Sequence, residues 1–205
     1  DRVDAPFVAF ADPEDIEVGQ WVIAVGNPFG LGGTVTAGIV SALGRNINAN
    51  AYDDFIQIDA PVNRGNSGGP AFDYGGRVIG VNTAIFSPSG GNVGIAFAIP
   101  ASIAAEVVED LRDDGEVSRG FLGVTLQPVS QDIVDALDLD DARGALIAQA
   151  QTDGPAAQAG IEDGDIIVAV NGEDVADSRE LARTIAELDP GDTASVTILR
   201  DGQTQ

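Results

Sequence analysis

Four residue types are absent from this 205-residue sequence: cysteine, histidine, lysine and methionine. Without cysteine, the chain has no disulfide framework and no thiolate-ligated zinc site. Without lysine, the glycine-rich stretch 26–33 does not qualify as a P-loop, because that loop needs a lysine on the phosphates. No apolar run approaches the roughly 18 residues of a membrane span, and the first residues are charged, so the sequence predicts neither a signal peptide nor an anchor.

Positive charge is scarce: 33 acidic residues face 10 basic ones, all arginine, for a net charge of −23. Residues 1–117 carry 16 acids and 5 arginines (−11), and residues 118–205 carry 17 and 5 (−12), so the acidity covers the whole chain. Such a surface repels phosphates, and nucleic-acid binding is not expected. A solvated acidic coat is the ordinary interpretation. Adaptation to high salt is the alternative, and it requires stability to fall at low salt.

The first half of the sequence has the pattern of a small β-barrel. Short β-branched runs are separated by Gly, Asn and Pro turns with no helix between them, which predicts strands at 21–25, 34–43, 55–58, 71–72, 77–85 and 94–99. Six strands at this spacing suit a closed antiparallel barrel. After Pro100, apolar residues at helical spacing predict a helix over 101–113, with one stripe for packing.

A second pattern begins after Gly120 and mixes strands with helices. It predicts strands at 121–126, 144–150, 165–170 and 193–200, and helices at 131–137 and 178–188, the latter capped by Ser178. The turn Asp201-Gly202 is followed by only three residues, which predicts a missing partner strand. The acidic cluster 138–141 lacks the glycine and glutamate of an EF-hand and is interpreted as a loop. The domain boundary is expected near 116–119.

The candidate catalytic segment is residues 63–70, Asn-Arg-Gly-Asn-Ser-Gly-Gly-Pro. Glycines allow a tight turn that aims successive N–H groups into one small space, and such a ring of donors suits a developing oxyanion. Ser67, at the rim of this loop, is a candidate nucleophile. The alternative for a bare Ser-Gly-Gly is an ordinary surface turn.

Short motifs run in a fixed order along nearly the whole chain. In the first half they are VGNPFGL (25–31), GIVSALGR (38–45), FIQ (55–57), NRGNSGGP (63–70), VIGVNTAI (78–85) and GIAFAIP (94–100). In the second half they are RGFLGV (119–124), GPAA (154–157), AGI (159–161) and GDII (164–167). Together they resemble the HtrA/Deg family, bacterial serine proteases with a chymotrypsin-like domain followed by PDZ domains.

The resemblance implies a mainly β fold in two domains. Residues 1–117 would form the C-terminal, six-stranded antiparallel barrel of a trypsin-like protease domain, with the N-terminal barrel missing. Residues 118–205 would form an α+β PDZ domain with its last strand truncated. Matching from mid-domain favours a fragment of a longer protein. Two residues ahead of the nucleophile loop depart from the family pattern, Ile58 and Pro61.

The family's catalytic triad is His, Asp and Ser, and Ser67 matches the serine. The resemblance implies that the N–H groups of Gly65 and Ser67, with Asn66 as a third candidate, hold the oxyanion. The triad His and Asp belong upstream of the matched segment, and this chain has no histidine. We therefore expect the 205 residues alone not to cleave unfolded casein. The alternative is a non-catalytic, peptide-binding pseudoprotease, and the residues that precede Asp1 in the gene would discriminate the two.

The resemblance also implies a specificity pocket and a regulatory residue. Ile85 and Ile95, with Phe86 beside them, match pocket-lining positions that would favour small aliphatic side chains, although core packing is the alternative. Thr83, Ala84 and Ile85 could pair with an extended substrate. Arg45 matches a loop arginine that relays activation in this family.

In the PDZ-like half, the loop Phe121-Leu122-Gly123-Val124 would bind a peptide C-terminus. Leu181 and Ile185 are candidate wall residues, with the domain core as the equal alternative. Family resemblance further implies protein quality control under stress in a bacterial periplasm, misfolded polypeptides as substrates, and a homotrimer or higher oligomer. It implies no metal and no cofactor.

Overall fold

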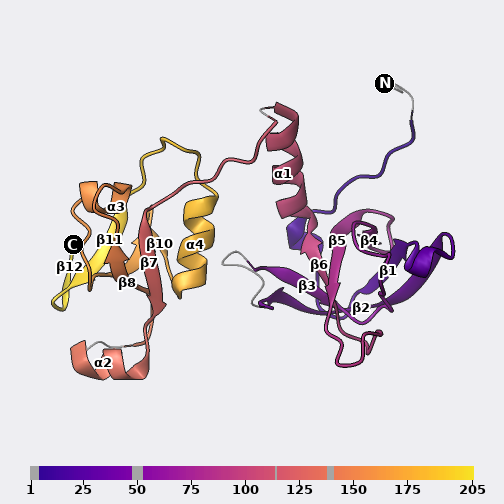
Figure 1. The fold of residues 1–205 in the computed structure, drawn as a ribbon, viewed down its shortest axis with the longest axis horizontal. Helices are drawn as coiled ribbons and strands as arrows, with labels where there is room; N and C mark the ends of the chain where they lie inside the picture. The colour runs from indigo at the N-terminus through magenta and orange to yellow at the C-terminus, as the bar shows by residue number, and fades with distance from the viewer. Residues whose placement is uncertain (1–4, 48–52, 114, 138–140) are drawn as a thin grey trace. The chain divides into compact units, whose positions relative to one another are not determined.

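The computed structural model describes residues 5–47, 53–113, 115–137 and 141–205 (Figure 1). The chain divides into two compact units, Asp1–Val117 and Ser118–Gln205. Within the described residues, no helix is both long enough and apolar enough to span a bilayer.

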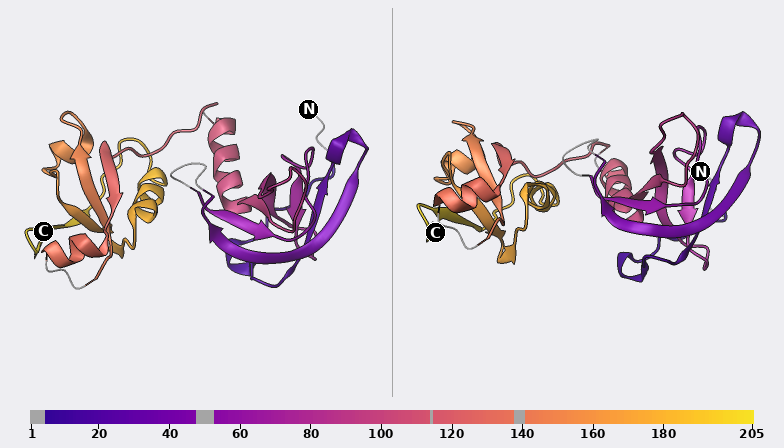
Figure 2. Two further views of the ribbon diagram at one scale, coloured as in Figure 1. Left: turned by 60° about the horizontal axis from the view of Figure 1, so that its bottom comes forward. Right: turned by 90° about the horizontal axis from the view of Figure 1, so that it is seen from below.

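The first unit is a closed six-stranded antiparallel barrel, which confirms the predicted fold. Its strand order is β1-β2-β3-β6-β5-β4. The long strand β2 curves along the barrel (Figure 2), as a strand must when a twisted sheet closes on itself. The strands are β1 (Trp21–Gly26), β2 (Thr34–Arg45), β3 (Phe55–Ile58), β4 (Pro70–Phe72), β5 (Val78–Ile85) and β6 (Ala96–Pro100).

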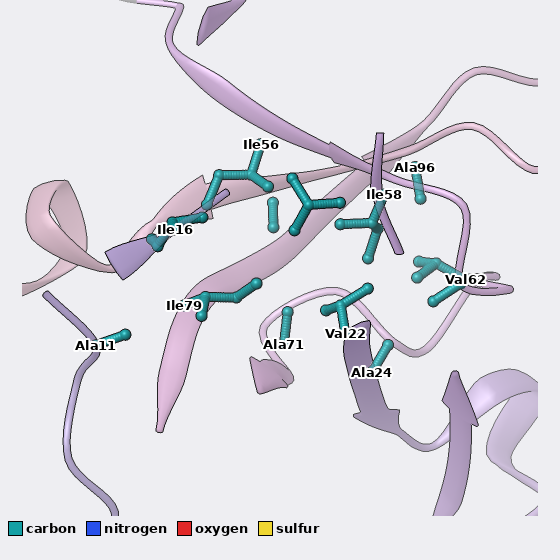
Figure 3. Close-up of a cluster of buried hydrophobic side chains, with 13 residues drawn as sticks. Ala11, Ile16, Val22, Ala24, Ile56, Ile58, Val62, Ala71, Ile79 and Ala96 are labelled. Atoms are coloured by element: carbon teal, nitrogen blue, oxygen red, sulfur yellow. The ribbon is translucent and has the colours of Figure 1, made fainter. Parts of the chain in front are cut away.

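Small and β-branched side chains fill the barrel interior. Figure 3 shows Val22 and Ala24 from β1 converging with Ile58 from β3 and Ile79 from β5. All four are fully buried, as expected for alternate residues that point to the inner face of a sheet. Ile58, one of the two departures from the family pattern, therefore packs in the core.

Two further segments cover the barrel. The segment before β1 contains the 3-10 turn η1 (Pro13–Asp15), and Arg77 Nη1 lies 2.7 Å from Asp15 Oδ2. Helix α1 (Ala101–Asp113) has the predicted bounds and packs on β5 and β6. Val108 and Leu111, both assigned to its packing stripe, remain about half exposed, so the stripe is only partly buried.

The second unit is a sheet of order β12-β11-β9-β8-β7, with β10 paired to β9. Apolar residues of the sheet and of α4 form its main core. The strands are β7 (Val124–Pro128), β8 (Ala145–Ala150), β9 (Ile166–Val170), β10 (Glu173–Asp174), β11 (Val196–Arg200) and β12 (Gln203–Thr204), and the helices are α2 (Gln131–Leu137), α3 (Pro155–Gln158) and α4 (Ser178–Ala186).

Several local predictions for this unit differ from the structure. Strand β7 begins at Val124 rather than at 121, because Gly123 adopts a φ of +75° and interrupts the extended run. Helix α4 is capped by Asp177, whose side chain accepts hydrogen bonds from the Arg179 and Glu180 amides, and Ser178 is its first residue. The turn at 201–202 leads into a short arm, β12, which pairs with β11. Residues 138–140 of the acidic cluster lie outside the described residues.

A partly buried ion pair joins the end of β11 to the loop before β9. Arg200 donates from Nε to Asp165 Oδ1 at 2.7 Å and from Nη2 to Oδ2 at 2.6 Å. Arg200 Nη2 also donates to the Gly160 carbonyl, and the Glu162 amide donates to Asp165 Oδ2. The hydrogen bonds from Arg200 hold the pKa of Asp165 below its ordinary value. The pair therefore ties together segments that are 35 residues apart.

Candidate active site and peptide-binding loop

The loop 63–70 connects β3 to β4 and presents Ser67 on the surface. The residue is exposed, and its Oγ donates a hydrogen bond to the Thr83 carbonyl at 2.9 Å. A hydroxyl buried among packed side chains would be incompatible with nucleophilic attack on a peptide. Ser67 is instead accessible, with its oxygen held in one direction.

The amides of the loop differ in their hydrogen bonding. The Asn66 N–H donates to the Asn63 carbonyl at 3.0 Å, so it is already used and does not fit the third oxyanion donor that the sequence suggested. Among the described residues, the N–H groups of Gly65 and Ser67 donate to no acceptor. These two amides are therefore available to stabilise a negative oxygen.

The first half of the loop packs on the turn η2 (Pro28–Gly30). The Asn27 amide donates to the Gly65 carbonyl at 3.2 Å, and the Phe29 amide donates to the Arg64 carbonyl at 2.8 Å. Gly65 has a φ of +102°, and a Cβ there would overlap the Asn27 carbonyl oxygen. Only glycine fits this position, because both the backbone conformation and the close approach exclude a side chain.

The predicted specificity residues lie at the end of β5 and just before β6. Ile85 is partly buried against the barrel core, and Phe86 is 56% exposed. The Phe86 amide donates to the Ile95 carbonyl at 3.1 Å, which brings Ile85, Phe86 and Ile95 together. The three residues thus share one end of the barrel with strand β5, whose Thr83 contacts the serine.

One edge of β5 remains open near the serine. The pairing of β4 with β5 ends at Pro70 and Val81. Beyond it, no described strand pairs with Thr83, Ala84 and Ile85 on that side. An open edge of this kind can accept an extended peptide as an added strand.

Arg45 lies at the end of β2, away from the nucleophile loop in sequence. Its Nε donates to Gln57 Oε1 on β3 at 3.0 Å. The other departure from the family pattern, Pro61, is exposed, and its carbonyl accepts a hydrogen bond from Thr36 Oγ1 at 2.8 Å.

In the second unit, the loop 121–124 has its carbonyls occupied and two of its amides open. The Leu122 carbonyl accepts from the Ala156 amide at 3.0 Å, and the Gly123 carbonyl accepts from the Gln151 amide at 2.8 Å. The N–H groups of Leu122 and Gly123 donate to no acceptor among the described residues. Adjacent open amides are suited to bind a carboxylate.

A cavity of about 730 Å³ adjoins this loop. Phe121, Leu122 and Ile185 contribute to its lining. Leu181 does not, because it is fully buried in the core of the unit. Of the two candidate wall residues, only Ile185 therefore reaches the cavity. Across the part of the chain that the structure describes, no cluster of three or more acidic side chains could hold a metal ion.

Models of known protein families match both units. The family model for the trypsin-like peptidase domain matches residues 1–81, and that for the PDZ domain matches residues 120–205. Among curated relatives, a probable periplasmic serine endoprotease, DegP-like, of Rhizobium meliloti is 60% identical over all of this chain and 41% of its own length. The corresponding protein of Halomonas elongata is 47% identical over 98% of this chain and 43% of its own. The chain thus spans about two fifths of these relatives.

Solved structures show the same similarity. The HtrA-type protease AlgW with a tripeptide has a TM-score of 0.89 and 42% identity, covering 98% of this chain and 67% of that one. The serine endoprotease from Yersinia pestis has a TM-score of 0.71 and 39% identity, covering 100% of this chain and 66% of that one.

Proposed function

The chain belongs to the HtrA-type, DegP-like family of serine endoproteases, and from this membership we propose that the full-length protein hydrolyses peptide bonds with Ser67 as nucleophile. The observation that carries the proposal is an exposed Ser67 hydroxyl in a loop whose Gly65 and Ser67 amides have no described acceptor.

The proposed reaction is acyl transfer in two steps. Ser67 Oγ attacks the peptide carbonyl carbon while its proton passes to a general base, and the carbonyl oxygen becomes an oxyanion. The C–N bond then breaks, the base returns the proton to the leaving amine, and an ester to Ser67 remains. Water, deprotonated by the same base, hydrolyses this ester and regenerates the hydroxyl. The base is an imidazole of the family triad, which the 205 residues do not contain.

We assign stabilisation of the oxyanion to the Gly65 and Ser67 amides. In subtilisin, loss of one such donor costs about 2.7–4 kcal/mol. Ile85, Ile95 and Phe86 would form the wall that receives the side chain before the cut, and an apolar wall favours small aliphatic residues. Thr83, Ala84 and Ile85 would pair with the substrate backbone.

The second unit would recognise chain ends. A terminal carboxylate would bind the open amides of Leu122 and Gly123, the peptide would pair with β7 from Val124 onward, and Ile185 would contact the last side chain. Phe121, whose side chain is 68% exposed, would cover the entrance to this peptide-binding site. Together the two units suit binding and cleavage of misfolded polypeptides.

Further properties follow from family membership as proposals. The relatives are named periplasmic, and we propose the same compartment and a role in protein quality control under stress. We also propose assembly into a homotrimer or a larger oligomer, with Arg45 as a regulatory residue.

The test is hydrolysis of unfolded casein by the full-length protein and by its Ser67→Ala variant. We expect the wild type to cleave casein and Ser67→Ala to lose at least about 10⁴-fold in kcat. Ser102→Ala, on α1 and outside the nucleophile loop, is the matched control and should retain activity. A wild type that binds casein without cutting it would support the pseudoprotease alternative instead.

A further inference from the structure

We propose that Asn82 is a positioning residue for Ser67, because it holds the second half of the nucleophile loop to strand β5. This inference rests on the proposed function, in which Ser67 is the nucleophile. Asn82 has no exposed surface, and its side chain Nδ2 donates to the Pro70 carbonyl at 3.1 Å.

The main chain of Asn82 binds the two residues before Pro70. The Gly68 amide donates to the Asn82 carbonyl at 2.8 Å, and the Asn82 amide donates to the Gly69 carbonyl at 2.9 Å. The next residue, Thr83, accepts the hydrogen bond from Ser67 Oγ at 2.9 Å. Four consecutive loop residues, 67–70, are therefore each bonded to residue 82 or 83.

The loop needs such external bonds because two of these residues are glycines. Gly68 and Gly69 have no side chains to restrict them, and a glycine pair has more backbone freedom than any other dipeptide. Pro70 has no N–H and cannot donate to β5 itself. The Asn82 side chain instead donates to the Pro70 carbonyl, which is the backbone hydrogen-bonding group that proline retains.

Packing alone does not explain an asparagine at this position. Asn82 Oδ1 is buried and has no hydrogen-bond partner among the described residues. An unpaired buried acceptor destabilises the fold, and an apolar residue of similar volume avoids that cost. Ile79, which is equally buried on strand β5, is apolar, as packing alone would favour. The amide therefore serves the loop rather than the core.

The experiment compares Asn82→Leu with Ile79→Val. Asn82→Leu removes the donor to Pro70 and the unpaired Oδ1 while it keeps the branched shape of the side chain, whereas Ile79→Val removes one buried methylene and leaves the loop bonds intact. In the 205-residue chain, we expect Asn82→Leu to have a Tm no lower than that of Ile79→Val. Its Gly68 amide should nevertheless exchange with solvent at least about tenfold faster by NMR.

In the full-length protein, Asn82→Leu should lower kcat by about 10–100-fold and change KM less than about threefold, since misplacement of a reacting group by about 1 Å costs on the order of 10²-fold. Ile79→Val should keep kcat within about twofold. A kcat for Asn82→Leu within twofold of wild type, or a fall matched by Ile79→Val, overturns the inference.

Two provisions keep the test decisive. If Asn82→Leu does not fold, Asn82→Ala removes the same donor without added bulk and takes its place. If the wild-type full-length protein cleaves nothing, the proposed function fails, and Gly68 exchange decides the inference alone. An unchanged exchange rate in the variant then overturns it.

Discussion

Replacing Asp165 by Asn should destabilise the second unit in a pH-dependent way. The carboxylate is buried, with 2% of its side chain exposed, and it accepts two hydrogen bonds from Arg200 and one from the Glu162 amide. Asparagine keeps an oxygen for Glu162 but turns an NH₂ group toward the guanidinium. Hydrogen bonds to charged groups contribute about 1.5–3 kcal/mol, so we expect a loss of about 2 kcal/mol. For a unit of this size that is about 8–16 °C in Tm.

The sign of the pH dependence follows from the pKa of Asp165. Arg200 holds that pKa below its ordinary value in the folded unit. The contribution is therefore fully present above the unfolded-state pKa of about 3.9 and is lost as the pH falls through the folded-state value. The difference in stability between wild type and Asp165→Asn should be largest at about pH 7 and should be smaller at about pH 2, because the carboxylate begins to be protonated below the unfolded-state pKa.

The assay is urea unfolding of the 205-residue chain, followed by the NMR signals of isoleucine methyl groups. Ile167 and Ile198 report on the second unit, and Ile58 and Ile79 in the barrel serve as an internal reference. Asp174→Asn, exposed on β10, is the matched control and should change stability by less than about 0.5 kcal/mol. The reasoning would be refuted if Asp165→Asn lost as little stability as Asp174→Asn. It would also be refuted if the stability difference between wild type and Asp165→Asn were equal at about pH 7 and about pH 2.

Two further predictions concern stability. Asp177→Ala should cost the second unit about 1 kcal/mol in urea unfolding, because the Asp177 Oδ1 that accepts from the Arg179 and Glu180 amides at 2.8 and 2.9 Å is lost, and equal stability of the variant would contradict this cap. Raising NaCl from about 0.05 to about 1 M should increase the free energy of unfolding of both units, because salt screens repulsion within a chain of net charge −23, and a flat salt dependence would exclude the salt-adaptation hypothesis.

Local patterns predicted most of the secondary structure because they depend on neighbours in the sequence. Strand 55–58 and the helices at 101–113 and 131–137 have the predicted bounds. The errors arise where neighbouring residues compete for the same structural role. Asp177 and Ser178 are both good cap residues, and Asp177 is the cap because the backbone at residue 177 is extended while Ser178 already belongs to the helix. The apolar pair at 121–122 has strand character, but the left-handed Gly123 that follows ends it.

The sequence by itself determined the barrel strands, the glycine-rich turn and Ser67 as its candidate nucleophile, since turn chemistry and β-branched runs act over a few residues. Tertiary structure alone decided that Leu181 is buried in the core, and that Thr83 and Asn82 hold the loop from 12 to 16 residues away. It also paired Asp165 with Arg200 across 35 residues. The reason is strand register: which side chains and amides meet depends on how distant strands align when the sheet closes, and no short pattern encodes that alignment.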